Sequence, residues 1–284
     1  MESFRTVDDR TLAYRREGAG PLLVCHPGGP GFSSRYFGDL AGLGESFTLI
    51  LLDPRGTGGS DHPAEARAYE TADYAADLDE LRAHLGLERM LLLGHSHGGV
   101  VAAAYAAAHP GRVEKLVLAS TIARFAEEQE AAMVRMMETR SAEPWYADAR
   151  DAIDREQGGD FAGEEELQEL VKREMPFYFA HFGDEERRYV EWLGEERPNP
   201  DALQLFNTET WPVFDLRPGL SSITAPTLVI TGELDFITGP ACAADFAAIP
   251  GQRTVLVEGC GHFILREARD RFRDEVTRFL GTST

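Results

Sequence analysis

Long apolar runs and cysteines are both scarce in this chain of 284 residues. No apolar run reaches the roughly 18–20 residues needed to cross a bilayer, and residues 2–10 are polar and acidic, unlike a secretory leader. The three cysteines, Cys25, Cys242 and Cys260, have neither the even number of a disulfide framework nor the spacing of metal ligands. We therefore expect reduced thiols and a soluble, cytoplasmic protein that does not bind membranes.

Positive charge is also in short supply. The chain has 28 lysines and arginines against 48 aspartates and glutamates, which gives a formal net charge of −20. Nucleic acids and anionic membranes bind surfaces of positive potential, so neither is an expected partner. The acidic balance is compatible with a cationic or amine-bearing substrate, although a solvated surface that aids solubility explains it more simply.

What the chain does contain is a series of short apolar runs that end in glycine-rich loops. Runs of this kind are typical of strands buried on both faces of a parallel sheet. Helical patterns alternate with them, which predicts the α/β class with helices on both faces of the sheet. The expected strands are residues 3–7, 11–16, 22–26, 47–53, 90–93, 115–120, 227–232 and 254–257, and the expected helices lie near 74–85, 97–108, 240–248 and 272–279.

The alternation stops between residues 121 and 223. This segment is acidic and aromatic, and it contains helical stretches near 127–140, 148–154, 164–173 and 184–192. A segment of this length is too long for a structureless loop in a compact domain. We predict a core domain made of residues 1–120 and 224–284 and a helical cap made of residues 121–223.

A serine stands at the corner of a strand-to-helix turn. The motif Gly-His-Ser-His-Gly-Gly occupies residues 94–99, directly after the apolar run 90–93. Glycines two positions before and two positions after Ser96 permit a turn too tight for larger side chains, which exposes the hydroxyl above the sheet. The pattern predicts that Ser96 is a catalytic nucleophile.

A serine hydroxyl needs a base and an acid that orients the base. His262 lies in a glycine-rich loop after the last expected strand and is the predicted base. Asp235 follows the strand 227–232 and is the predicted acid, with Glu233 as the second choice. The order Ser96, Asp235, His262 is the chain order of the hydrolases that use this turn.

The oxyanion of an acyl-transfer intermediate needs two N–H donors. One is expected to be the backbone N–H of His97, and the other comes from the loop 27–31, where Gly29 is the first candidate and Gly28 the second, because prolines have no N–H. His95 and His97 flank the serine but lack further ligands, so no metal is expected, and no cofactor motif is present.

Together these residues resemble the α/β-hydrolase superfamily and, within it, the proline iminopeptidase family. The resemblance rests on the serine motif, on Gly-Gly-Pro-Gly at residues 28–31 and on Asp-Pro-Arg-Gly-Thr-Gly-Gly-Ser at residues 53–60, and it covers about 20–120 and 224–280. It implies the α/β-hydrolase fold with an inserted helical cap and the release of an N-terminal residue, often proline, from short peptides.

Three positions depart from the family pattern. Pro27 stands where the family has histidine, His97 where it has an aromatic residue, and Phe236 where it commonly has an amine-binding glutamate. A second such glutamate usually lies late in the cap, where Glu209 is close but out of register. The residues expected to bind substrate are Gly28, Glu209, Trp211 and Phe236.

The sequence therefore predicts a cofactor-free serine hydrolase that acts on a small molecule or a short peptide, most simply an aminopeptidase of the proline iminopeptidase type. An apolar cap would equally suit a carboxylesterase or lactonase of small esters or thioesters. A third reading is a small-molecule receptor on the same fold, against which the complete set of catalytic residues argues. The oligomeric state does not follow from the sequence.

Overall fold

A computed structural model describes residues 1–65 and 67–281 of the chain. Among these residues, eight strands form one sheet in the order β1-β2-β4-β3-β5-β6-β7-β8. β2 is antiparallel to both of its neighbours, and all other neighbouring strands are parallel. The strands are β1 (Glu2–Arg5), β2 (Thr11–Gly18), β3 (Leu22–His26), β4 (Thr48–Leu52), β5 (Met90–His95), β6 (Val113–Ala119), β7 (Thr227–Gly232) and β8 (Arg253–Val257).

Both faces of the sheet are covered by helices. Successive side chains of a strand point to opposite faces, and in β3 Val24 packs into one core cluster while Leu23 and Cys25 pack into the other. On the Val24 face lie α1 (Thr71–His84) and α2 (His97–Ala108). On the opposite face lie η1 (Ser34–Phe37), η2 (Leu40–Glu45) and α11 (Arg269–Gly281).

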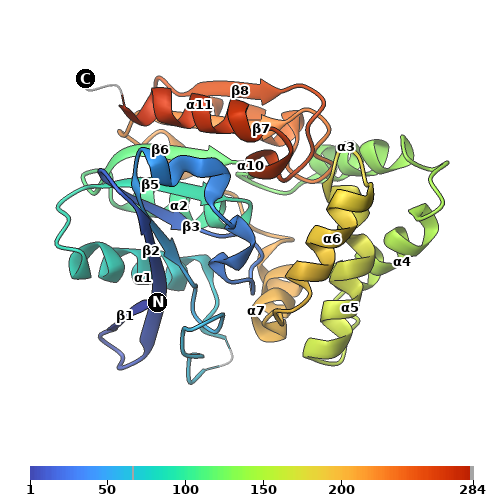
Figure 1. The fold of residues 1–284 in the computed structure, drawn as a ribbon, viewed down its shortest axis with the longest axis horizontal. Helices are drawn as coiled ribbons and strands as arrows, with labels where there is room; N and C mark the ends of the chain where they lie inside the picture. The colour runs from blue at the N-terminus through green and yellow to red at the C-terminus, as the bar shows by residue number, and fades with distance from the viewer. Residues whose placement is uncertain (66, 282–284) are drawn as a thin grey trace.

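The connection from β6 to β7 is a long helical segment, which we call the cap segment (residues 121–223). It contains no strand of the sheet, and Figure 1 shows α3 to α6 gathered beside the sheet. The division into a core domain and a cap domain stays a prediction. The elements of the segment are α3 (Glu127–Glu138), α4 (Tyr146–Gln157), α5 (Glu164–Glu174), η3 (Met175–Tyr178), α6 (Asp184–Leu193), α7 (Pro200–Leu205), η4 (Phe206–Thr210) and α8 (Arg217–Leu220).

The predicted α/β class and its mostly parallel sheet are confirmed, as is every predicted strand to within a few residues. The sequence patterns missed the last helices of the cap segment, α7, η4 and α8, because each is too short to show a helical period. The helix expected at 240–248 is two pieces, α9 (Pro240–Ala243) and η5 (Ala244–Ala248), and a further short helix, α10 (Ile264–Glu267), precedes α11.

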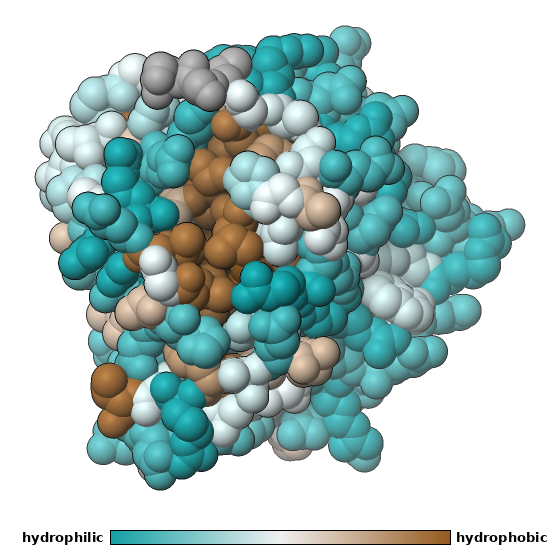
Figure 2. Space-filling model, turned by 60° about the vertical axis from the view of Figure 1, so that its left-hand side comes forward, coloured by the Kyte–Doolittle hydropathy of each residue, from teal (hydrophilic) through white to brown (hydrophobic). Residues whose placement is uncertain are grey.

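Polar and charged residues cover most of the face shown in Figure 2, around an apolar patch near its centre. Such a surface accords with the excess of acidic residues in the chain. In the part of the chain that the structure describes, no helix combines the length and the apolar character that crossing a membrane requires.

Candidate active site

Ser96 sits at a sharp corner between β5 and α2. Its backbone has φ 55° and ψ −126°, a region that residues with a side chain seldom occupy and that is typical of strained functional positions. A Cβ on Gly94 would lie 2.2 Å from the carbonyl oxygen of Gly98, so the two arms of the turn approach too closely for any side chain there. The Gly-x-Ser-x-Gly pattern thus has a direct steric cause, and it places Ser96 at the rim of a pocket.

His262 and Asp235 form a buried hydrogen-bonded pair. Nδ1 of His262 lies 2.9 Å from Oδ2 of Asp235, and both side chains are almost fully buried. Burial alone would raise the pKa of Asp235, but the neighbouring His262 and the hydrogen bonds from His262 and Thr238 lower it below its usual value. Oδ1 of Asp235 accepts the N–H groups of Ile237 and Thr238, which fixes the carboxylate. The pair holds the imidazole in one orientation, and no hydrogen bond to its Nε2 is formed by residues 1–65 and 67–281.

The loop that carries His262 is tied to the cap segment. The His262 N–H donates to the carbonyl oxygen of Tyr178 at 2.8 Å. The carboxylate of Glu267 accepts the N–H groups of Gly261 and Ala180, which connects the same two segments a second time. Glu233, the second choice for the acid, lies at the surface and accepts the N–H of Gly259 instead.

The glycine-rich loop after β3 lies against Ser96. A Cβ on Gly28 would lie 2.7 Å from Cβ of Ser96, so only glycine permits this approach. The N–H of Gly28 donates to the Tyr36 hydroxyl at 2.5 Å and is therefore occupied. Gly29 has φ +112°, and its N–H is the remaining donor of the pair of glycines that line the pocket. On the other side, the N–H of His97 is the first of α2, where helices have no internal acceptor.

Three histidines near the serine are buried and neutral. Burial lowers the pKa of His26 to about 4 and those of His95 and His97 to about 3. Nδ1 of His26 lies 2.9 Å from the carbonyl oxygen of Pro27, within hydrogen-bonding distance. His97 lines the pocket, and its Nε2 has no hydrogen-bond partner among the described residues. The rings of His95 and His97 therefore give the pocket polar lining without positive charge.

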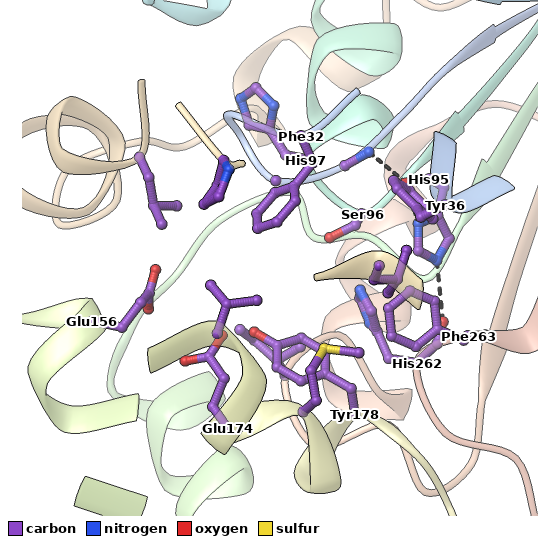
Figure 3. Close-up of a pocket in the computed structure, with 18 of the residues that line it drawn as sticks. Phe32, Tyr36, His95, Ser96, His97, Glu156, Glu174, Tyr178, His262 and Phe263 are labelled. Carbon is purple, nitrogen blue, oxygen red and sulfur yellow. Dashed lines mark hydrogen bonds between the residues drawn. The ribbon is translucent and has the colours of Figure 1, made fainter. Parts of the chain in front are cut away.

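One pocket joins these groups to the cap segment. Ser96, His262 and both glycines line it from the core, and Trp211 and Tyr178 line it from the cap segment. Figure 3 shows the Ser96 hydroxyl and the His262 ring facing the same space. Trp211 therefore lies where the sequence placed a substrate-binding residue, stacked in a tilted arrangement on Phe125.

Two buried carboxylates face this pocket from the cap segment. Glu156 comes from α4 and Glu174 from the end of α5, with exposed fractions of 7% and 4%. Burial raises the pKa of Glu156 to about 7, and burial together with the charge of Glu156 raises the pKa of Glu174 well above its usual value. Asn207 donates to Oε1 of Glu156, whereas Oε2 of Glu174 has no partner among the described residues. Carboxylates in this position can bind a cation.

The sequence analysis missed both glutamates, although a signal for them exists. In α5 the buried residues Leu167 and Leu170 are followed by Glu174, at i, i+3 and i+7. In α4 the buried stripe likewise ends in Glu156, seven residues after Ala149. A carboxylate that continues the apolar stripe of an amphipathic helix points inward, and such a residue is a candidate site residue.

Two predicted substrate-binding residues lie elsewhere and are corrected. Glu209 is exposed, and its carboxylate pairs with Arg67 outside the pocket, because the π-helical turn η4 directs it to the surface. Phe236 packs against the rings of Phe177 and Tyr178 in an apolar cluster behind the pocket wall. Neither side chain is among those that line the pocket in the described part of the chain.

Potential metal ligands do not cluster in the part of the chain that the structure describes. Across residues 1–65 and 67–281, no group of three or more His, Cys, Asp or Glu side chains is arranged to hold a metal ion. The three cysteines are buried, and burial raises the pKa of each thiol far above neutral pH.

Comparisons with known proteins agree with the fold. A family model described as alpha/beta hydrolase fold matches residues 21–268. The proline iminopeptidase of Saccharolobus solfataricus is 28% identical over an alignment of 286 residues. The alignment covers 94% of this chain and 87% of that protein.

Two solved structures cover nearly the whole chain. An esterase from Exiguobacterium antarcticum has a TM-score of 0.76 and 22% identity, and covers 99% of this chain and 99% of its own. A proline iminopeptidase from Mycobacterium smegmatis has a TM-score of 0.75 and 22% identity, and covers 99% of this chain and 98% of its own. At these identities the two structures support the fold and do not decide between an amide and an ester substrate.

Proposed function

The chain belongs to the alpha/beta hydrolase family and resembles the proline iminopeptidases, and from this premise we propose that it is a serine aminopeptidase that releases an N-terminal residue from short peptides or amides. Ser96 is the proposed nucleophile, His262 the base and Asp235 the residue that orients it. These three assignments are supported by the strained turn at Ser96 and by the hydrogen bond between His262 and Asp235.

In the proposed mechanism the Ser96 hydroxyl attacks the scissile carbonyl carbon and passes its proton to Nε2 of His262. Nδ1 of His262 is held by Asp235, so Nε2 is the nitrogen available to accept it. The N–H groups of Gly29 and His97 stabilise the oxyanion. His262 then protonates the leaving amine, and water attacks the acyl-enzyme with His262 again as the base.

The observation that carries the choice of an amine-bearing substrate is the pair Glu156 and Glu174. Burying carboxylates without a cation costs several kcal/mol per ion. Glu174, whose Oε2 has no partner among the described residues, lines the same pocket as Ser96. An ammonium group is the ligand that offsets this cost. The substrate amine would therefore bind at these carboxylates, in the pocket that Ser96 also lines.

The test compares three substrates: L-proline p-nitroanilide, its N-acetyl derivative and p-nitrophenyl butyrate. We expect turnover of the free-amine anilide and loss on acetylation. A charge-assisted hydrogen bond contributes about 1.5–3 kcal/mol, so Glu174→Gln should lower kcat/KM for the free-amine substrate by about 10–100-fold. Turnover of the ester should stay nearly constant.

A matched control comes from the same helix. Glu169 lies on α5, is exposed and does not line the pocket, so Glu169→Gln should leave all three rates unchanged. Equal turnover of free and acetylated anilides, or Glu174→Gln losses that are the same for the anilide and the ester, would count against the amine-binding role.

The second candidate function is a hydrolase of small apolar esters. It is favoured by the apolar part of the pocket wall, which includes Val100, Ile122 and Phe206. Ester turnover alone, with no anilide turnover at any pH, would make this function the better one.

A further inference from the structure

Three hydrogen bonds connect the loops on the two sides of Ser96. The Gly28 N–H donates to the Tyr36 hydroxyl at 2.5 Å, and this oxygen lies 2.8 Å from Nδ1 of His95. Nε2 of His95 lies 3.1 Å from the carbonyl oxygen of His262. We propose that Tyr36 and His95 are positioning residues, which hold the glycine-rich loop and the His262 loop in register for the reaction at Ser96.

The direction of each of these three hydrogen bonds is determined. The carbonyl oxygen of His262 can only accept, so Nε2 of His95 carries the proton. Nδ1 of His95 is then an acceptor and takes the Tyr36 O–H. The Tyr36 oxygen in turn accepts the N–H of Gly28, which can only donate. Each donor therefore meets one acceptor, and no second arrangement satisfies all of them.

The side chains that form these hydrogen bonds are buried and uncharged. Tyr36 is 8% exposed and His95 is 1% exposed. Burial, together with the nearby His262, lowers the pKa of His95 to about 3, so the imidazole stays neutral at physiological pH. Hydrogen bonds removed from water are strengthened by the low local dielectric, and an unpaired buried partner is costly. The three bonds therefore resist separation of the two loops.

The consequence for catalysis rests on the proposed serine hydrolase function. The Gly28 N–H is used by Tyr36, which leaves Gly29 as the oxyanion donor of the loop. A shift of this loop moves that donor, and a shift of the other loop moves the His262 ring. A misplacement of about 1 Å can cost about 100-fold in rate. The three hydrogen bonds therefore affect the stability of the transition state more than the binding of substrate.

The test removes one hydroxyl. Tyr36→Phe keeps the ring and leaves both the Gly28 N–H and Nδ1 of His95 without their partner. We expect kcat to fall by about 10–100-fold with KM within about threefold. The affinity for a boronic acid, which forms a tetrahedral adduct with a reactive serine, should fall by a similar factor, whereas the affinity for free L-proline should not change.

Tyr189→Phe is the matched control. The Tyr189 hydroxyl donates to the carbonyl oxygen of Tyr36 at 2.8 Å and contacts neither Gly28 nor His95 through a hydrogen bond. This variant also loses one buried hydroxyl next to Tyr36, so its thermal stability should fall by a comparable amount. Its kcat and its boronate affinity should stay within about twofold of wild type. Equal kinetic losses in the two variants would overturn the positioning role.

Two further readings separate this inference from the proposed function. A wild-type protein that a fluorophosphonate fails to label at Ser96 would overturn the proposed function. A labelled wild type with equally fast labelling of Tyr36→Phe would overturn only the positioning role. Nitrogen NMR of His95 tests the inference without an activity measurement. The three hydrogen bonds require the proton of His95 on Nε2, and a proton on Nδ1 would contradict the inference.

Discussion

The two walls of the pocket differ in how their carboxylates are satisfied. On the core wall, formed by the loops that carry Ser96, His262 and the glycines, both oxygens of Asp235 accept hydrogen bonds and its pKa is lowered. On the cap wall, formed by α4 and α5, Oε2 of Glu174 has no partner among the described residues and its pKa is raised.

The difference shows what each wall is organised to do. Carboxylates with complete hydrogen bonding are fixed in place and support a reaction that needs one geometry. Carboxylates that are buried and incompletely bonded lower the stability of the fold unless a ligand completes them. The core wall therefore has the properties of the proposed catalytic machinery, and the cap wall has those of a binding site.

The largest expected effect is on the core wall at the proposed nucleophile. Ser96→Ala should lower kcat by about 10⁴–10⁶-fold, because the hydroxyl of the proposed nucleophile is removed. Initial rates on L-proline p-nitroanilide and p-nitrophenyl butyrate measure the loss, and the variant should resist fluorophosphonate labelling. If either activity is retained, the nucleophile is another residue or the reaction takes place at another site.

The next effect concerns the acid of the core wall. Asp235→Asn should lower kcat by about 10⁴-fold, because an amide cannot stabilise the protonated His262 or enforce its tautomer. Glu233→Gln changes the exposed second choice and should leave the rate within a few-fold of wild type. A larger loss from Glu233→Gln than from Asp235→Asn would reverse the assignment.

On the cap wall, pH should change the choice between substrates. The pKa of Glu156 is raised to about 7, so Glu156 becomes neutral as the pH falls below this value and loses its attraction for an ammonium group. The ratio of kcat/KM for the free-amine anilide to that for the ester should fall by about fivefold to tenfold between pH 7.5 and pH 6. A pH effect on the steps that the two substrates share changes both rates and cancels in the ratio.

This ratio can be checked in the variants. In a double variant with Glu156→Gln and Glu174→Gln the ratio should be low and independent of pH. A ratio that stays constant in the wild-type protein over this range would contradict an amine-binding role for the pair.

The smallest effect is on stability. Because the pKa of Glu174 is raised in the folded protein, the folded state binds more protons than the unfolded state, and stability is lost as pH rises through the folded pKa. Glu174→Gln should therefore raise Tm by a few degrees at pH 8 and change it little at pH 4. Thermal unfolding at the two pH values is the measurement, and a lower Tm at pH 8 would mean that the carboxylate stabilises the empty pocket.

The same two walls separate what the sequence could predict from what it could not. The sharp turn at Ser96 and the glycine loop leave patterns in the sequence because steric limits permit few residue types there. The strand ends that carry Asp235 and His262 follow from the alternation of elements. The α/β class and the family resemblance are confirmed, whereas the roles of these residues stay predictions until tested.

The cap wall left a weaker pattern. Alpha-helical segments rich in glutamate do not reveal which carboxylates face inward unless the helix phase is known, and α5 contains five glutamates of which one points into the pocket. Glu209 was chosen by its place in the family pattern, and the register of η4 directs it outward. Phe236 was chosen from its neighbour Asp235, but adjacent residues of a loop point in different directions.

The hydrogen bond from the His262 N–H to the Tyr178 carbonyl oxygen has a consequence for protein engineering. Residues 178–180 belong to the cap segment by sequence, but they hold the loop that carries His262, and Glu267 bonds to both segments. A chimaera that receives a foreign cap in place of residues 121–223 would lose this support. Keeping residues 178–180 with their native partners is therefore a design rule for exchanging the cap segment while the His262 loop keeps its position.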